Sequence, residues 1–270
     1  MPLFDRYLGI DYSGAQTAEA SLSGLRVFEA SPSVDPVEIH PPPSPKKYWT
    51  RRGLALWLAQ ELESGPPTLV GMDHGFSFPL RYFQEHNLPL DWPLFLEDFQ
   101  KHWPTDEPHT YVDFVRKGMC GAGAERSGNS RWRRLTELQC RSAKSVFHFD
   151  VQGSVAKSTH AGIPWLLYLR RQLQNKVHFW PFDGWLPPAG RSVITEIYPS
   201  LWSRLFPKGT LNSHQQDAFA SVAWMQQQDS QNWLSQCFNI ELPAAVKKTA
   251  QIEGWILGCS PERNKVGKGF

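Results

Sequence analysis

The sequence predicts a mixed α/β fold in which an antiparallel meander and parallel crossover strands form one sheet with helices on both faces. Three observations lead to this prediction. Short strand-like runs succeed one another near the start of the chain, a helix-spaced segment separates two apolar runs that both end in aspartate, and two later helices flank a further strand. A chain of 270 residues is long enough for one such domain with an insertion.

The first part of the chain is expected to form the meander. Strands are predicted over residues 5–12, 18–22 and 25–30, with the turn Ser23-Gly24 before the last of them. The first strand carries the apolar run Leu8-Gly9-Ile10 and ends in Asp11. Residues 31–46 are rich in proline and serine, which indicates a stiff connector rather than a strand or helix.

A helix and a second strand that ends in aspartate are predicted next. Apolar residues recur with helical spacing from Tyr48 to Glu63, before the break at Ser64-Gly65-Pro66-Pro67. The run from Thr68 to Met72 then repeats the pattern of the first strand, because it is apolar and is followed at once by Asp73.

Residues 76–150 interrupt this order and are predicted to be a partly helical insertion over one end of the sheet. The segment is rich in aromatic residues and contains a basic patch of Arg131, Arg133 and Arg134. Such a patch can contact the phosphates of a nucleic acid, or it can lie in a solvated loop. Regular structure then resumes, with a helix predicted over 161–173, a strand over 192–199 and a helix over 213–224 capped by Ser213.

Composition excludes several classes of protein. The formal net charge is only +2, so nucleic-acid binding would depend on a local patch. The chain has no apolar run of membrane-spanning length and no secretory signal at its start, so we expect a cytoplasmic protein. The four cysteines form no C-x-x-C pair, which argues against a zinc ribbon, and they are expected to be free thiols.

Four acidic side chains form the candidate site. Asp11 and Asp73 end strands that are expected to be parallel neighbours, so their carboxylates would meet at the edge of the sheet where α/β proteins bind ligands. Asp217 would reach this edge from a helix whose alanines allow close packing, and Glu196 lies in the last strand. Clustered carboxylates repel one another and favour a bound Mg²⁺ or Mn²⁺ ion. His214, three residues before Asp217, could orient a water molecule or accept a proton.

These residues resemble motifs of the DUF429 family of RNase H-like nucleases. The similar segments are Gly9-Ile10-Asp11, Met72-Asp73 with Phe76-Ser77-Phe78-Pro79, Gln152-Gly153 with Lys157, Glu196-Ile197-Tyr198-Pro199, and Asp217-Ala218. The resemblance implies an RNase H-like sheet and metal-dependent cleavage of phosphodiester bonds, similar to that of RuvC-type resolvases. Residues 91–150 depart from the compact pattern of the family.

Two other functions stay open from the sequence. An actin-like or sugar-kinase-like ATPase would share the sheet and the opening Gly-Ile-Asp, although the chain is short for two duplicated halves. A non-catalytic module could instead bind single-stranded nucleic acid through some of the twelve tryptophans and the arginine patch. A phosphate-binding P-loop is excluded at Lys157, because Ala156 stands where the motif requires glycine.

The preferred interpretation is a nuclease that uses a divalent metal ion to hydrolyse nucleic acid, either DNA or RNA. Its predicted metal ligands are Asp11, Asp73, Glu196 and Asp217, and His214 completes the predicted catalytic set. The side chains predicted to bind substrate phosphates are those of Lys157, Arg131, Arg133 and Arg134.

Overall fold

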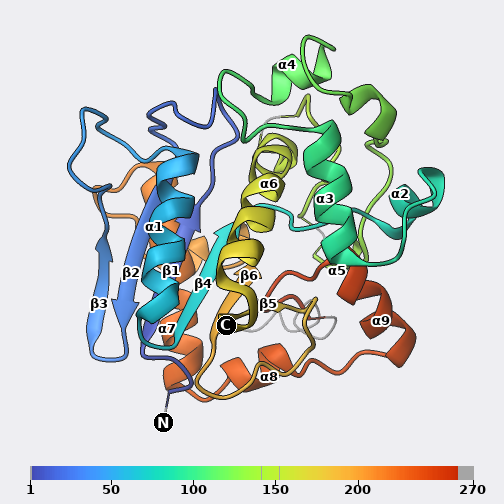
Figure 1. Ribbon diagram of the computed structural model, residues 1–270. Helices are drawn as coiled ribbons and strands as arrows, with labels where there is room; N and C mark the ends of the chain where they lie inside the picture. Colours follow the sequence, from blue (N-terminus) through green and yellow to red (C-terminus); the bar gives the residue numbers. More distant parts are fainter. Residues whose placement is uncertain (1, 141, 152, 261–270) are drawn as a thin grey trace.

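The structure is a computed structural model that describes residues 2–140, 142–151 and 153–260 (Figure 1). Its strands are β1 Arg6–Asp11, β2 Arg26–Ser31, β3 Val34–Glu38, β4 Thr68–Asp73, β5 Val177–Trp180 and β6 Ser192–Glu196. Its α-helices are α1 Arg51–Ser64, α2 Leu80–Glu85, α3 Trp92–His102, α4 Val112–Arg116, α5 Leu135–Gln139, α6 Ala156–Leu173, α7 Ser213–Ser230, α8 Leu234–Phe238 and α9 Ala244–Glu253. Short 3₁₀ helices are η1 Gly123–Arg126, η2 Gln174–Lys176, η3 Pro199–Leu201 and η4 Ser203–Leu205.

The six strands form one mixed sheet in the order β3-β2-β1-β4-β6-β5. Strand β2 is antiparallel to both β1 and β3, whereas β1, β4, β6 and β5 all run in the same direction. Asp11 lies opposite Asp73 in the β1–β4 register, so the two strands end side by side. The predicted mixed α/β sheet, with an antiparallel meander followed by parallel crossover strands, is therefore confirmed.

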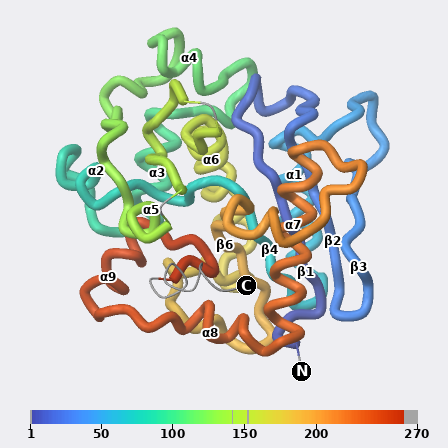
Figure 2. Tube along the Cα trace, turned by 180° about the vertical axis from the view of Figure 1, so that it is seen from behind, coloured from blue at the N-terminus to red at the C-terminus, as the bar shows by residue number. Residues whose placement is uncertain are grey.

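Helices cover both faces of this sheet. Helices α1 and α6 lie on one face in Figure 1, and the view from behind in Figure 2 shows α7 lying along β1 and β2 on the other face. One apolar core fills the space under α1 and α6 and includes Leu54 and Leu166. A second core lies on the α7 side and includes Val222 and Trp224. None of the described helices is long and apolar enough to cross a membrane.

Side chains alternate between the two cores along each central strand, as the pleat of a strand requires. In β1, Leu8 and Ile10 belong to the core on the α1 and α6 side, whereas Tyr7 belongs to the core on the α7 side. In β4, Val70 and Met72 likewise face α1 and α6, and Leu69 faces α7. Odd-numbered positions of both strands therefore face α7.

Glycine allows α7 to lie directly on the sheet. A Cβ atom at Gly9 would lie 2.4 Å from the backbone oxygen of Ala218, which is too close for two non-bonded atoms. Any other residue at this position would therefore force the helix to move. The alanines of α7 provide the other half of this close contact, as expected from the sequence. The helix is longer than the predicted range 213–224, and its N-cap is Asn212, whose side chain accepts a hydrogen bond from Gln215 N at 2.9 Å.

Several predicted elements differ from the structure. Residues 18–22 do not form a strand, and the third strand of the meander is β3, within the stretch predicted to be a connector. Strand β3 contains Pro36 and exposes Val34 and Val37, which is tolerated because β3 is at the edge of the sheet and is paired on one side only. The helix predicted over 161–173 begins earlier, at Ala156, and β5, α8 and α9 were not predicted.

Residues 76–150 connect β4 to α6 through α2, α3, α4, η1 and α5, in agreement with the predicted partly helical segment. Figure 1 shows these helices beyond the ends of β4 and β6. Aromatic side chains form their core, where Phe78 contacts the rings of Tyr82, Phe95, Phe99 and Phe147. Burial of so many rings accounts for the aromatic content of this segment.

The cysteines differ from the expectation of four free thiols. Cys140 and Cys259 are joined by a disulfide, with their Cα atoms 6.1 Å apart, whereas Cys120 and Cys237 are free. The prediction was wrong for the bonded pair because 119 positions separate the two residues in the sequence, and only the fold brings them together.

Candidate functional site

Asp11 and Asp73 end adjacent strands on the face of the sheet covered by α7. They are partners in the parallel register, and both occupy odd-numbered positions, so their side chains leave the sheet in the same direction. Asp11 is buried, with 7% of its surface exposed, and Asp73 is partly exposed. The two aspartates that were predicted to meet at this edge are therefore brought together.

The first turns of α7 bring His214 and Asp217 to the same two carboxylates. A hydrogen bond of 2.7 Å joins Nδ1 of His214 and Oδ2 of Asp11. The ring packs against the turn before β2, since a Cβ atom at Gly24 would lie 3.3 Å from its Cε1 atom. The His214 side chain is still 54% exposed, so the ring is accessible to solvent or to a substrate.

Burial and mutual repulsion both disfavour negative charge in this cluster. Burial is the main cause that raises the pKa of Asp73 well above its usual value, and the charges of Asp11, Asp217 and Glu196 raise it further. Burial also raises the pKa of Asp11 to about 6, although the hydrogen bond and the charge of His214 oppose that change. The pKa of Asp217 is raised by burial as well.

The cations near these carboxylates are unevenly distributed. The charges that lower the pKa of Asp11 are those of His214 and Arg26, and those that lower the pKa of Asp217 are those of His214 and Lys208. No cation among the described residues lowers the pKa of Asp73, and its carboxylate makes no hydrogen bond or ion pair with them. Asp73 is therefore a carboxylate surrounded by other carboxylates.

The raised pKa of Asp11 leads to a prediction about pH. Its protonated form is favoured by folding, so the contribution of Asp11 to stability is present below the ordinary pKa of 3.8 and is lost as the pH rises through about 6. Groups facing Asp11 are His214, Asp217 and Arg26. We expect the melting temperature of metal-free Asp11→Asn to rise relative to that of the unchanged protein as the pH increases from 4 to 7. A difference that is constant over this range would contradict the raised pKa.

Glu196 lies at the same edge of the sheet but belongs to its other face. It is the register partner of Met72, which faces α1 and α6, so its side chain leaves the sheet on the side opposite to Asp11 and Asp73. Arg134 Nη1 and Nη2 each donate a 2.7 Å hydrogen bond to a different oxygen of the Glu196 carboxylate. Glu196, which was predicted to bind a metal ion, is therefore paired with a buried arginine instead.

The ion pair of Glu196 and Arg134 is part of a larger buried network. Arg134 Nε donates to Oε1 of Glu137 at 2.8 Å, and Arg134 is only 1% exposed. Although burial lowers its pKa, the charges of Glu196 and Glu137 outweigh that effect and raise the pKa of Arg134 overall. The prediction that Arg134 belongs to an exposed substrate-binding patch is wrong, because its guanidinium is buried and pairs with Glu196 and Glu137.

The other predicted phosphate-binding residues differ in their contacts and exposure. Lys157 is at the start of α6, but its Nζ atom pairs with Oδ2 of Asp113 at 2.7 Å. Arg133 donates hydrogen bonds to the backbone oxygens of Glu137 and Ala143. Only Arg131 of the three arginines is exposed. Gln152, which the family resemblance included, lies outside the described residues.

Arg51 organises the loop after Asp11 and was not identified from the sequence. It is fully buried, and its guanidinium donates to the backbone oxygens of Ser13, Ala15 and Gln16 at 2.7–3.0 Å. The loop also touches α6, since a Cβ atom at Gly14 would overlap the backbone of Lys157 at 2.1 Å. These contacts fix the conformation of the loop that follows Asp11.

A metal ion would need some adjustment of these side chains. Among the described residues, no three His, Cys, Asp or Glu side chains already stand in a metal-ligating arrangement. The donor set still suits a hard cation, because Asp11, Asp73 and Asp217 offer oxygen ligands and Asp73 has no positive partner. Glu196 does not fit this set, since Arg134 occupies both of its oxygens.

Comparisons of the chain with models of known protein families, with curated proteins and with solved structures returned no match. The function is therefore inferred from the geometry of the site.

Proposed function

We propose that this protein is a divalent-metal-dependent nuclease with an RNase H-like fold. The single observation that carries the proposal is the environment of Asp73, a carboxylate at a strand end whose charged neighbours are all acidic. Such a position is costly for a free protein and is relieved by a bound cation. The proposed ligands are Asp11, Asp73 and Asp217.

The topology supports the fold assignment. Three antiparallel strands precede the first crossover helix, and the first strand is central, with a parallel partner on its other side. Acidic residues end the two central parallel strands, and ligands of open α/β sheets bind at that edge. The same arrangement is expected of an RNase H-like nuclease.

The residues of the site have separate roles in this proposal. Asp11, Asp73 and Asp217 bind the cation, and a divalent ion bound there would activate water and offset charge on the phosphate. His214 holds the carboxylate of Asp11 in a fixed orientation through its Nδ1 hydrogen bond. The exposed ring of His214 is accessible for proton exchange with a substrate or with solvent.

Cleavage assays test the proposal directly. We expect the protein with Mn²⁺ to cleave at least one of a set of single-stranded, duplex and branched DNA and RNA substrates. Addition of EDTA should stop the reaction, because the three aspartates alone provide neither a Lewis acid nor a counter-charge for the phosphate. Arg52→Ala is a suitable control, since this exposed arginine of α1 lies outside the site.

ATP binding separates a nuclease from a kinase-like ATPase. An ATPase that holds ATP in a cleft should gain about 2.7 kcal/mol of stability at a ligand concentration 100 times the dissociation constant. We expect millimolar ATP with Mg²⁺ to change the melting temperature little. Strong stabilisation by ATP, with no cleavage of any nucleic acid in the set, would favour the kinase-like function over our proposal.

A further inference from the structure

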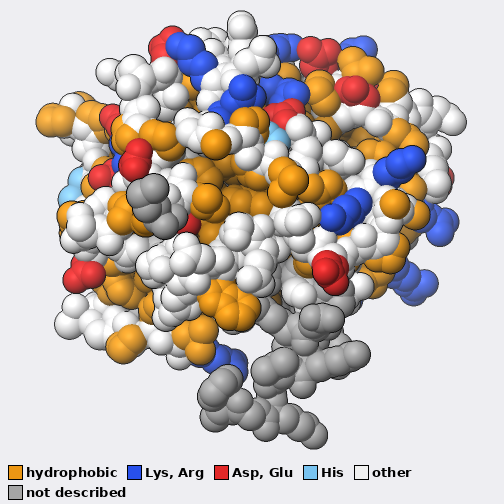
Figure 3. Space-filling model, turned by 90° about the horizontal axis from the view of Figure 1, so that it is seen from below, with side chains coloured by type: hydrophobic (Ala, Val, Ile, Leu, Met, Phe, Trp, Pro, Cys, Tyr) orange, Lys and Arg blue, Asp and Glu red, His pale blue; other side chains and the backbone are white. Residues whose placement is uncertain are grey.

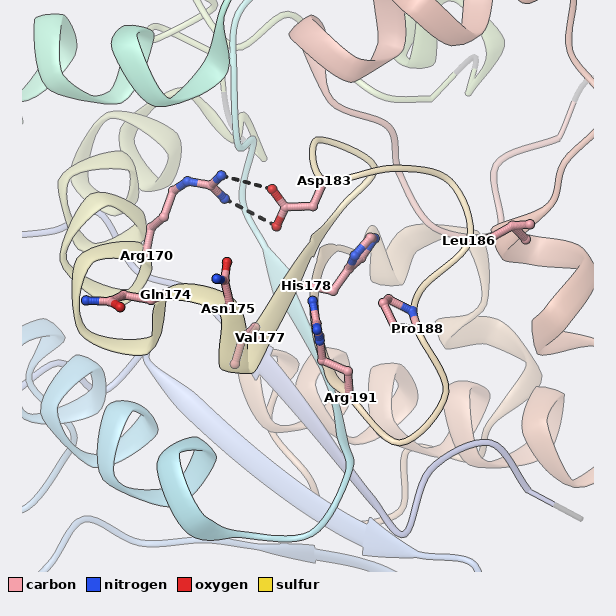
Figure 4. Close-up of a pocket in the computed structure, with 9 residues that line it drawn as sticks. All are labelled: Arg170, Gln174, Asn175, Val177, His178, Asp183, Leu186, Pro188 and Arg191. Carbon is pink, nitrogen blue, oxygen red and sulfur yellow. Dashed lines mark hydrogen bonds and ion pairs between the residues drawn. The ribbon is translucent and has the colours of Figure 1, made fainter.

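A cavity opens at the other edge of the sheet, where the parallel strands begin. It has a volume of about 400 Å³ and is lined from the end of α6, the start of β5 and the loop that leads to β6 (Figure 4). A six-residue strand is about 20 Å long, so the cavity is well separated from the aspartates at the opposite strand ends. Figure 3 views the molecule from this side, where hydrophobic side chains gather in the middle of the face and charged side chains of both signs lie around them.

Arg191 is the residue that gives this cavity its chemistry. It lines the cavity directly before β6, and its guanidinium makes no hydrogen bond or ion pair with any described residue. Figure 4 shows the guanidinium beside the ring of His178. This cation contributes to the lowered pKa of His178, of which burial is the larger cause, so His178 does not compensate the charge of Arg191.

The one acidic side chain that lines the cavity is already neutralised. Asp183 pairs with Arg170 through two contacts of 2.9 and 3.3 Å, and it also accepts a hydrogen bond from Phe179 N at 2.8 Å. The cavity therefore has one positive charge in excess. A guanidinium in this state favours a planar or tetrahedral oxyanion, which can accept two parallel N–H hydrogen bonds.

Further lining residues suit an organic molecule that carries such a group. Gln174 and Asn175 provide amide donors at the end of α6. Gln174 has φ 44°, a backbone conformation that favours glycine. A polar side chain therefore stands at a strained backbone position in the cavity lining. Leu186, which is 66% exposed, and Pro188 are apolar residues of the cavity lining and belong to the loop that leads to β6.

We propose that this cavity, the Arg191 pocket, is a binding site for a small organic oxyanion, with Arg191 as the residue that binds the charged group. The apolar body of the ligand would contact Leu186 and Pro188. The proposal is independent of the nuclease function, because the pocket shares no residue with the acidic site.

Calorimetric titration of the full chain without added metal tests this site. Phenyl phosphate, benzoate and inorganic phosphate are the probes, because the first two combine an apolar ring with different oxyanions and the third has no ring. We expect one equivalent of phenyl phosphate or benzoate to bind, and inorganic phosphate to bind more weakly. Whichever ring-bearing probe binds more tightly identifies the oxyanion as a phosphate or a carboxylate.

Variants connect the binding to Arg191. We expect Arg191→Gln to weaken binding at least tenfold, Arg191→Lys to weaken it less, and Arg52→Ala to leave it unchanged. Arg191 is partly exposed, so the substitutions should leave the melting temperature without ligand nearly unchanged. Absence of binding by all three probes, unchanged binding by Arg191→Gln, or an equal loss with Arg52→Ala would each overturn the proposal.

Discussion

Replacing Asp73 with asparagine is expected to abolish metal-dependent cleavage while leaving the metal-free protein at least as stable as before. Changes to residues that only support metal ligands cost about 10–100-fold in activity, so loss of a direct ligand should reduce cleavage by more than about 100-fold. Stability should not fall, because the side chain has no positive partner among the described residues and the charges of Asp11, Asp217 and Glu196 raise its pKa. Removal of a charge from such a cluster relieves repulsion.

The measurements are cleavage rates with Mn²⁺ and melting curves in EDTA. Asp35→Asn is a matched control, because it makes the same chemical change at an exposed position of β3. Isothermal titration with Mn²⁺ gives a readout that does not depend on finding the substrate, and Asp73→Asn should lose that binding. A sharp fall in the melting temperature of Asp73→Asn would show that Asp73 is a structural hydrogen-bond acceptor, and our assignment of the site would fail.

Replacing Arg134 with methionine is expected to produce the largest loss of stability of any substitution considered for this protein. The change leaves the carboxylates of Glu196 and Glu137 buried without their common partner. Breaking a buried ion pair by removing one partner costs about 3–5 kcal/mol, because an uncompensated charge stays in the interior. Urea unfolding of Arg134→Met, compared with Arg131→Met at an exposed position, measures this cost.

A second substitution identifies the source of the loss. Glu196→Gln in the Arg134→Met background should recover part of the stability, since it removes one of the two unpaired charges. Glu196→Gln alone should keep Mn²⁺ binding, because its carboxylate belongs to the buried network rather than to the acidic site. Loss of Mn²⁺ binding in a folded Glu196→Gln protein would return Glu196 to the set of metal ligands.

A repeated short pattern in the sequence was sufficient to place the two central aspartates. Gly9-Ile10-Asp11 and Gly71-Met72-Asp73 have the same spacing, and both follow apolar strand residues. Glycine two positions before the acid allows α7 to lie against the same face of the sheet from which the acid projects. In β6 the residue two positions before the acid is Ile194 rather than glycine. This difference indicates that Glu196 faces the other side of the sheet.

Local pattern therefore determined the main strands, the first crossover and the convergence of Asp11, Asp73 and Asp217. It failed where an element depends on distant partners. Strand β3 forms because β2 offers it an open edge, although Pro36 and the surrounding residues favour a connector. Its pairing energy comes from another strand, which the composition of the segment itself does not describe.

The tertiary structure alone decided how the charges are used. Arg131, Arg133 and Arg134 are indistinguishable as a basic patch in the sequence, yet one is exposed, one binds backbone oxygens and one is buried between two glutamates. The physical reason is that the cost of a buried charge depends on partners supplied by other segments, here Glu196, which is 62 positions from Arg134. For the same reason, the free cation of the Arg191 pocket became visible only when the fold showed that Asp183 pairs with Arg170.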